Sequence, residues 1–255
     1  MDFEKVVIGD AILYFGDSLK IMRSMPDKSV NMVFTDPPYG HNNNNGDLIQ
    51  NWEVALGRGK KQPCRPIIND GKEANDLFKN ALPEFDRLLD SGCCCCCCCC
   101  CGGGPDPQFA RWSLWMDQIF NFKQMVVWDK GKIGMGWHYR RSYETVLVAD
   151  KKGHKPRWHT DRKNIENIIR PGDYGIKKII PKKTDHPTPK PVELAQHFIS
   201  LHTVKGDIVL DAFMGHASTG VAAIRSGRKF VGIELDREHF DKACERIEAE
   251  YQACR

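Results

Sequence analysis

The segment VNMVFTDPPY, residues 30–39, decides the fold, because it reads as a buried strand that ends in two consecutive prolines. The apolar run of residues 30–35 is typical of such a strand. Proline cannot continue a sheet ladder, so the chain is expected to leave the sheet at Pro37 and Pro38. Open α/β sheets bind ligands at the carboxyl ends of their strands. Asp36 and Tyr39 are therefore predicted to lie at the ligand-binding edge of a sheet.

These four residues also have a distinctive chemistry. The Pro37 carbonyl has no ladder partner and lies next to the Asp36 side chain, which places two hydrogen-bond acceptors beside the flat ring of Tyr39. This arrangement suits the binding of an amino group on a planar heterocycle. An ordinary strand exit with a surface Asp and Tyr is the alternative, and only the rest of the chain can decide between them.

The remaining pattern alternates strands with helices over 255 residues, 41% of them hydrophobic. This alternation predicts an α/β fold with a doubly wound, mostly parallel sheet, and the length favours a single domain spanning 1–255. We expect a hairpin over 6–15, strands at 30–35, 93–101, 124–128, 143–149, 207–213 and 229–235, and helices at 18–25, 73–89, 107–120, 190–203, 218–226 and 237–251. Pro83 is expected to kink or split its helix.

Nine of the twelve cysteines form one run, residues 93–101. In a strand, alternate side chains point to opposite faces, so such a run has no ligand spacing, and four thiols do not easily converge on a tetrahedral metal ion. The run follows a Ser91-Gly92 turn and ends in glycines. We interpret it as a buried strand whose thiols pack as small apolar side chains, and we predict no metal site.

A second informative segment is the strand 207–213, which leads into a turn containing Gly215 and then into a helix. This is a common nucleotide-binding unit, and Glu234, at the end of the next strand, suits a carboxylate that binds ribose hydroxyls. A P-loop would need Lys-Ser/Thr after Gly220, where Val221 stands, and a dinucleotide fingerprint would need a third glycine. A nucleoside without a phosphate chain therefore fits best, and a plain βαβ unit is the alternative.

Together these motifs resemble those of the amino-group DNA methyltransferases, which transfer a methyl group from S-adenosylmethionine to adenine N6 or cytosine N4. Because Asp-Pro-Pro-Tyr precedes the cofactor motif, the order resembles the β group, a circular permutation of the Rossmann-like methyltransferase sheet. Other segments match in the expected order: Gly16-Asp17-Ser18-Leu19, Val127-Trp128-Asp129-Lys130, Tyr139-Arg140-Arg141-Ser142-Tyr143-Glu144 and His186-Pro187-Thr188-Pro189-Lys190-Pro191. The resemblance covers nearly the whole chain except 42–66 and 151–185.

The resemblance assigns residues to roles. It implies catalytic roles for Asp36, Pro37, Pro38 and Tyr39. It implies that S-adenosylmethionine is bound by Asp17, Ser18, His186, Pro187, Thr188, Lys190, Asp211, Phe213, Gly215, Ser218, Thr219 and Glu234. The chain departs from the usual family motif at Ala212, His216, Ala217 and Ser218. At Ala217 a glycine is replaced, which is expected to add a Cβ where the backbone passes close to the ligand.

The expected reaction follows from the weak nucleophilicity of the exocyclic amine. Hydrogen bonds to Asp36 and the Pro37 carbonyl would favour a pyramidal nitrogen that attacks the methyl group in line. The base must leave the duplex, and Tyr39 is expected to stack on it. Adenine N6 is favoured because Asp36 stands where cytosine-N4 enzymes more often carry Ser. A cytosine-N4 enzyme and an RNA adenine methyltransferase are the alternatives.

Three other functions fit the sequence less well. A cytosine-C5 enzyme would need Cys64 at a strand end, but it lies in a polar loop. A methyltransferase for protein or small-molecule amines usually has Asn at the Asp36 position. A DNA-binding module without catalytic activity would transfer no methyl group.

Double-stranded DNA is the expected partner, although the net charge is only +4. The segment 151–185 is the candidate target-recognition region, and 41–66 is expected to be a mobile loop. Membrane association is not expected, since no apolar run approaches the roughly 20 residues of a span, and we predict a cytoplasmic protein. A homodimer and a cognate restriction enzyme remain open. DNA contacts are expected from Arg140, Arg141, Lys155, Arg157 and Trp158.

Overall fold

The computed structural model describes residues 3–39, 68, 71, 73–99, 108–133, 142–177 and 190–253. Across these residues the strands form one sheet of nine, in the order β1-β2-β9-β8-β3-β4-β6-β5-β7. The strands are β1 (Glu4–Ile8), β2 (Ala11–Phe15), β3 (Val30–Thr35), β4 (Leu89–Cys99), β5 (Asn121–Asp129), β6 (Tyr143–Asp150), β7 (Ile168–Ile169), β8 (Ile208–Asp211) and β9 (Lys229–Glu234). Among the described helices, none has the length and apolar character that crossing a membrane requires.

The centre of the sheet is parallel, as the sequence predicts. Strands β2, β9, β8, β3 and β4 all run in the same direction. Strand β6 is antiparallel to both β4 and β5, and β1 is antiparallel to β2, which confirms the expected hairpin. The two-residue strand β7 pairs with β5 and was not predicted.

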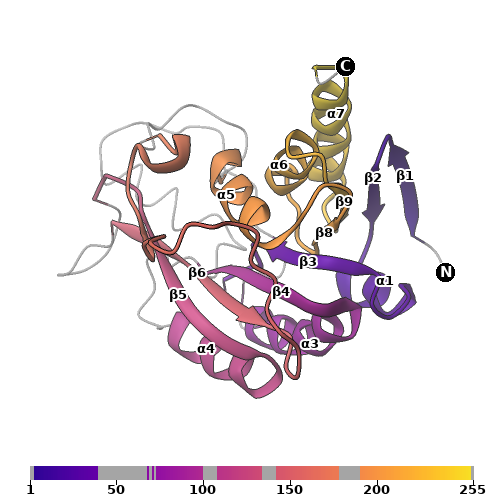
Figure 1. Ribbon diagram of the computed structural model, residues 1–255. Coiled ribbons are helices and arrows are strands. Elements are labelled where there is room, and N and C mark those ends of the chain that lie inside the picture. The colour runs from indigo at the N-terminus through magenta and orange to yellow at the C-terminus, as the bar shows by residue number, and fades with distance from the viewer. Residues whose placement is uncertain are drawn as a thin grey trace, which may run out of the picture.

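Helices cover both faces of the sheet (Figure 1). One face carries α1 (Ser18–Ser24), α3 (Glu73–Leu88) and α4 (Gln108–Ile119), and the other carries α5 (Val192–His202), α6 (Ser218–Arg225) and α7 (Arg237–Ala253). The chain passes from β3 through α3 to β4 in one direction and from β8 through α6 to β9 in the other. The strand order therefore reverses between β3 and β8, the point at which doubly wound sheets bind ligands. The predicted α/β class is confirmed.

Helix α3 runs through Pro83 as one element, so the predicted split does not occur. Phe78, Leu82 and Phe85 lie on its buried face and pack into the core. This packing holds the helix together where the proline removes a backbone hydrogen bond.

The predicted turn at Ser91-Gly92 lies inside β4, which is a correction to the sequence interpretation. The register with β3 shifts there, because Val30 is opposite Leu89 whereas Met32 is opposite Cys94. Gly92 has φ +73, so the extra residues form a bulge and the strand continues beyond them.

The cysteines of β4 alternate between the two cores. Cys94 and Cys96 face the side of α5, and Cys93, Cys95 and Cys97 face the side of α3 and α4. All five side chains are buried, in agreement with the expected buried strand.

Candidate active site

A cavity of about 150 Å³ opens where β3, β8 and β9 end. Every residue that the sequence assigns to catalysis or to the cofactor, and that the structure describes, lines this cavity. These are Asp17, Ser18, Asp36, Pro37, Pro38, Tyr39, Lys190, Asp211, Phe213, Gly215, Ser218, Thr219 and Glu234. His186, Pro187 and Thr188 lie outside the described residues.

Lys190, just before α5, holds the Asp36 side chain. Its Nζ lies 2.6 Å from Asp36 Oδ2, 3.0 Å from the Tyr39 hydroxyl and 3.4 Å from Glu144 Oε2. Glu144, on β6, also pairs with Lys130. The other carboxylate oxygen, Asp36 Oδ1, is buried and has no hydrogen-bond partner among the described residues. One oxygen of Asp36 is thus anchored, and the other remains an acceptor.

The surroundings of Asp36 bring its pKa close to neutral pH. Burial raises the pKa of Asp36 to about 6, because removing a carboxylate from water disfavours its charged form. The Lys190 ammonium opposes this shift, whereas Glu144 and Asp211 add to it. Asp36 is therefore mostly ionised at neutral pH.

Asp211 has a different environment, although it ends the neighbouring strand. Its Oδ1 accepts hydrogen bonds from the Thr35 hydroxyl at 2.7 Å and from the Phe213 N–H at 3.2 Å. A further hydrogen bond from Thr219 opposes the rise in the pKa of Asp211 that burial causes. Asp211 therefore joins the end of β3 to the turn before α6. Hydrogen bonds from the protein occupy most of its carboxylate.

Glu234 organises the other half of the cavity. Its Oε2 accepts the Gly215 N–H at 2.9 Å, and its Oε1 accepts the N–H groups of Leu235 and Asp236 at 2.9 and 2.8 Å. Burial raises the pKa of Glu234 to about 7, and these three donors oppose the rise. A carboxylate has about four lone-pair sites, so Oε2 keeps one that a ribose hydroxyl can use. The carboxylate and the glycine turn therefore fit a nucleoside.

Two further features shape the cofactor side. Asp17 caps α1 by accepting the Lys20 N–H at 2.9 Å. Arg246, on α7, donates to the His216 carbonyl at 2.9 Å and to Ser218 Oγ at 3.1 Å. Arg246 thus fixes the turn before α6, and nothing in its local sequence distinguishes it from other surface arginines.

The substitution of glycine by Ala217 does not have the expected effect. Ala217 adopts a left-handed conformation, with φ 54, and its side chain is buried in the hydrophobic core. It is not among the residues that line the cavity. The added Cβ therefore points into the core, and the predicted approach to the ligand is not observed.

The Tyr39 ring borders the cavity but is already packed on one side. It is 8% exposed, with its centroid 6.3 Å from that of Trp112. Lys190 Nζ lies 5.3 Å from the ring centroid. Trp112 stacks on Phe78 at 4.0 Å, so an aromatic cluster supports Tyr39 from behind.

Three of the residues expected to bind DNA, Lys155, Arg157 and Trp158, do not line the cavity. Arg157 pairs with Asp90 at 3.4 Å and with Asp207 at 3.7 Å, at the amino ends of β4 and β8. Lys155 and Trp158 are exposed nearby. The six residues of β3 separate this edge from Asp36 by about 20 Å. DNA binding by these three residues therefore stays a prediction, and the DNA surface that we propose lies at the edge that carries Asp36. Arg140 and Arg141 lie outside the described residues.

The candidate recognition region reaches the catalytic edge only later in the chain. Ile168 and Ile169 of β7 pair with Val127 and Trp128, near the carboxyl end of β5. Arg170 follows them and is exposed. The described part of the region, 151–177, thus runs from the amino edge of the sheet to its carboxyl edge. Residues 178–185 and the loop 41–66 lie outside the described residues.

Comparisons with known proteins identify this architecture. The family model described as DNA methylase matches residues 30–245, so the chain belongs to the N6/N4 DNA methylase family. It is 27% identical to the DNA adenine methyltransferase YhdJ of Escherichia coli, over 91% of this chain and 81% of that protein. It is 28% identical to the type II methyltransferase M2.DpnII of Streptococcus pneumoniae, over 94% and 90%.

Solved structures agree with this membership. The complex of M1.HpyAVI with S-adenosylmethionine superposes with a TM-score of 0.60 at 26% identity, covering 92% of this chain and 98% of that one. The DNA modification methylase TTHA0409 of Thermus thermophilus, complexed with S-adenosyl-L-methionine, gives 0.66 at 24% over 93% and 95%. The cytosine-N4-specific PvuII methyltransferase gives 0.66 at 21% over 98% and 95%. The latter two likenesses support the fold alone.

Proposed function

We propose that this DNA methylase transfers a methyl group from S-adenosylmethionine to the exocyclic N6 amine of adenine in a flipped-out base. The observation that carries the proposal is the state of Asp36. Asp36 lines the cavity with its Oδ2 held by Lys190, and its Oδ1 is buried with no partner among the described residues. A buried acceptor without a partner is costly unless a ligand supplies the donor.

The amino group of the target base is the donor that fits. One N–H would bond to Asp36 Oδ1 and the other to the Pro37 carbonyl, which turns the nitrogen lone pair away from the ring. S-adenosylmethionine supplies an electrophilic methyl group on a sulfonium centre when bound. After transfer the nitrogen carries one proton too many, and we place that proton on Asp36 Oδ1. With its pKa near 6, this carboxylate accepts the proton readily and then releases it to solvent.

The cofactor is expected to occupy the part of the cavity lined by Asp17, Gly215 and Glu234. Glu234 would hold the ribose hydroxyls, and the first turn of α6 would face the cofactor with its unpaired N–H groups. Arg246 keeps this turn in place from behind. The target base then enters beside Tyr39, at the other end of the same cavity.

Adenine is favoured over cytosine by two observations. Asp36 stands at the leading position of the motif, and the relative of 27% identity is itself named a DNA adenine methyltransferase. The test is incubation with S-adenosylmethionine and duplex DNA, followed by mass spectrometry of the nucleosides. N6-methyladenine is the expected product. N4-methylcytosine alone would show the wrong base, and methylation of RNA in preference to DNA would show the wrong nucleic acid.

We also propose that DNA approaches the carboxyl edge of the sheet, where the cavity opens. Lys132, after β5, and Arg170, after β7, are described cations that follow adjacent strands at this edge, and Arg170 also pairs with the exposed Glu166 at 2.5 Å. They would hold phosphates and carry no sequence information themselves.

A further inference from the structure

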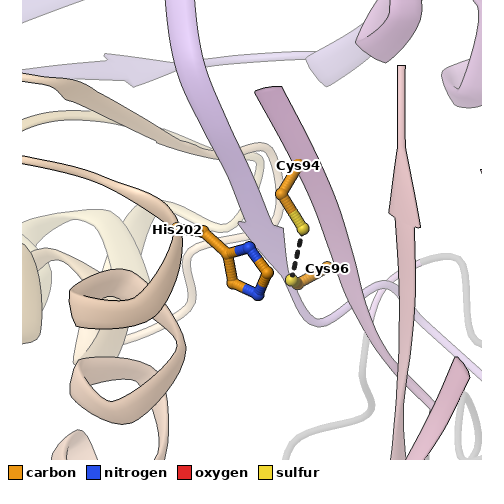
Figure 2. A group of neighbouring side chains, drawn as sticks. All are labelled: Cys94, Cys96 and His202. Atoms are coloured by element: carbon orange, nitrogen blue, oxygen red, sulfur yellow. Dashed lines mark hydrogen bonds between the residues drawn. The ribbon is translucent and has the colours of Figure 1, made fainter. Parts of the chain in front are cut away.

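A second group of reactive side chains lies outside the catalytic cavity. Cys94 and Cys96 on β4 and His202 at the end of α5 place two sulfur atoms and a ring nitrogen within 4.8 Å of one another (Figure 2). The two Sγ atoms are 3.2 Å apart, and all three residues are buried.

The strand geometry explains why these thiols converge and their neighbours do not. Cys94 and Cys96 are two positions apart, so they share the face of β4 that packs against α5. Cys95 and Cys97 share the opposite face, where α3 and α4 cover them. The run has no ligand spacing in the sequence, but α5 brings a histidine to one face only.

The spacing of the three atoms fits a tetrahedral ion. Zn–S bonds of about 2.3 Å and Zn–N bonds of about 2.0 Å place tetrahedral ligand atoms about 3.5 to 3.8 Å apart. The two Sγ atoms lie 3.2 Å apart and the ring nitrogen lies within 4.8 Å of both, so modest side-chain shifts would admit an ion.

His202 is oriented as a ligand. Its Nδ1 is buried and has no hydrogen-bond partner among the described residues, and Figure 2 shows the ring beside the two sulfurs. The Arg157 backbone also hydrogen-bonds the ring. Metal-bound histidines commonly use their second nitrogen in this way, which fixes the tautomer and the ring orientation.

Cysteine binds soft and borderline metal ions as the thiolate, so Cys94 and Cys96 would each release a proton when the ion binds.

A cavity reaches one member of the site, His202. It has a volume of about 280 Å³ and is lined by His202 and Asp150, and it shares no lining residue with the catalytic cavity. Asp150 lies opposite Cys94 in the register of β4 and β6 and is buried. Its carboxylate is therefore the neighbouring group for a water molecule or other ligand in the fourth position.

We propose that Cys94, Cys96 and His202 bind a Zn²⁺ ion through two thiolates and the imidazole Nδ1. The ion would link the carboxyl end of α5 to the centre of the sheet, outside the catalytic cavity, with Cys96 opposite Phe34 of β3. Its role is accordingly structural, because it joins the helix that follows Lys190 to the strand beside β3.

The test measures the metal in the reduced full-length protein purified after growth with added Zn²⁺. Elemental analysis is expected to find one Zn²⁺ per chain, and X-ray absorption at the zinc edge is expected to find two sulfurs and at least one imidazole nitrogen. Zinc bound by sulfur alone, or no zinc above the background of the buffer, would overturn the proposal without any variant.

Matched double variants then locate the site. Cys94→Ala with Cys96→Ala should remove the zinc, whereas Cys95→Ala with Cys97→Ala removes two equally buried thiols from the other face and should retain it. His202→Gln should weaken Zn²⁺ binding by more than the roughly 10- to 100-fold typical of an outer-sphere partner, and Asp150→Asn by about that amount. Equal zinc loss in both double variants, or unchanged affinity in His202→Gln, contradicts the assignment.

Discussion

The Lys190 ammonium lies 2.6 Å from Asp36 Oδ2, and the two residues are 154 positions apart in the chain. This ion pair fixes the rotation of the carboxylate and leaves Oδ1 without a partner among the described residues. Because Lys190 also contacts the Tyr39 hydroxyl, a single side chain sets both the acceptor and the ring beside it. The geometry of the Asp-Pro-Pro-Tyr segment thus depends on a residue that is distant in the sequence.

Replacing this lysine is the first prediction. Lys190→Met should lower kcat/KM by about 100-fold, since a displaced carboxylate loses the alignment of the amine. Lys190 also lowers the pKa of Asp36, so the acid limb of the pH profile should move to higher pH in the variant. Lys155→Met, on the opposite edge, is the matched control and should keep both values. An unshifted acid limb would show that Lys190 does not act through Asp36.

The pH dependence of the wild-type enzyme follows from the same carboxylate. Its pKa in the folded protein is raised from 3.8 to about 6, and only the ionised form can accept two donors. Methyl transfer should therefore be fully active above this value and fall about tenfold per pH unit below it. The profile of kcat/KM at saturating cofactor measures this dependence. Constant activity down to pH 5 would place the essential ionisation elsewhere.

Cofactor binding should titrate separately, through Glu234. Burial raises the pKa of this carboxyl to about 7, and donated ribose hydroxyls favour the ionised form. The Kd for S-adenosylmethionine should therefore weaken as the pH falls below about 7. Glu234→Gln should bind the cofactor about 10- to 100-fold more weakly and without this pH dependence. Calorimetric titration over a pH series measures both effects. A variant with the wild-type profile would show that Glu234 does not bind the cofactor.

The two edges of the sheet can be compared by reversing charge. Arg170→Glu should raise the KM for DNA and reduce the dependence of binding on salt, because a phosphate contact is lost. Lys155→Glu makes the same change of charge at the amino edge and should have little effect. The comparison is made by DNA-binding titrations at several salt concentrations. A larger loss of DNA affinity in Lys155→Glu than in Arg170→Glu would place the DNA-binding surface at the amino edge, as the sequence predicts.

Local sequence is enough to predict the strand before Asp36 and the turn at Gly215, because each is defined by adjacent residues. The apolar run, the two prolines and the glycine turn place these side chains at the edge of the sheet whatever packs around them. The family order then brings Asp17, Asp36 and Glu234 to one cavity, which the structure reproduces.

What the sequence could not indicate depends on contacts between distant segments. The sequence predicts Arg157 as a DNA-binding cation, but it does not indicate the two carboxylate partners, Asp90 and Asp207, that the fold places beside it. Arg246 has no local motif, because its role arises from the packing of α7 against the turn before α6. In the same way, the cysteine run acquires a ligand set only when α5 delivers His202 to one of its faces.

The most direct test of the account is single-turnover methylation by Asp36→Asn, compared with its affinity for S-adenosylmethionine. Asn keeps the shape of the side chain but replaces the carboxylate, so the base amine loses its charged acceptor. We predict that methyl transfer to duplex DNA falls by about 100- to 1,000-fold while the Kd for the cofactor stays within about threefold of wild type. Methylation at near wild-type rates in Asp36→Asn would contradict the assignment of Asp36 as the residue that binds the target amine.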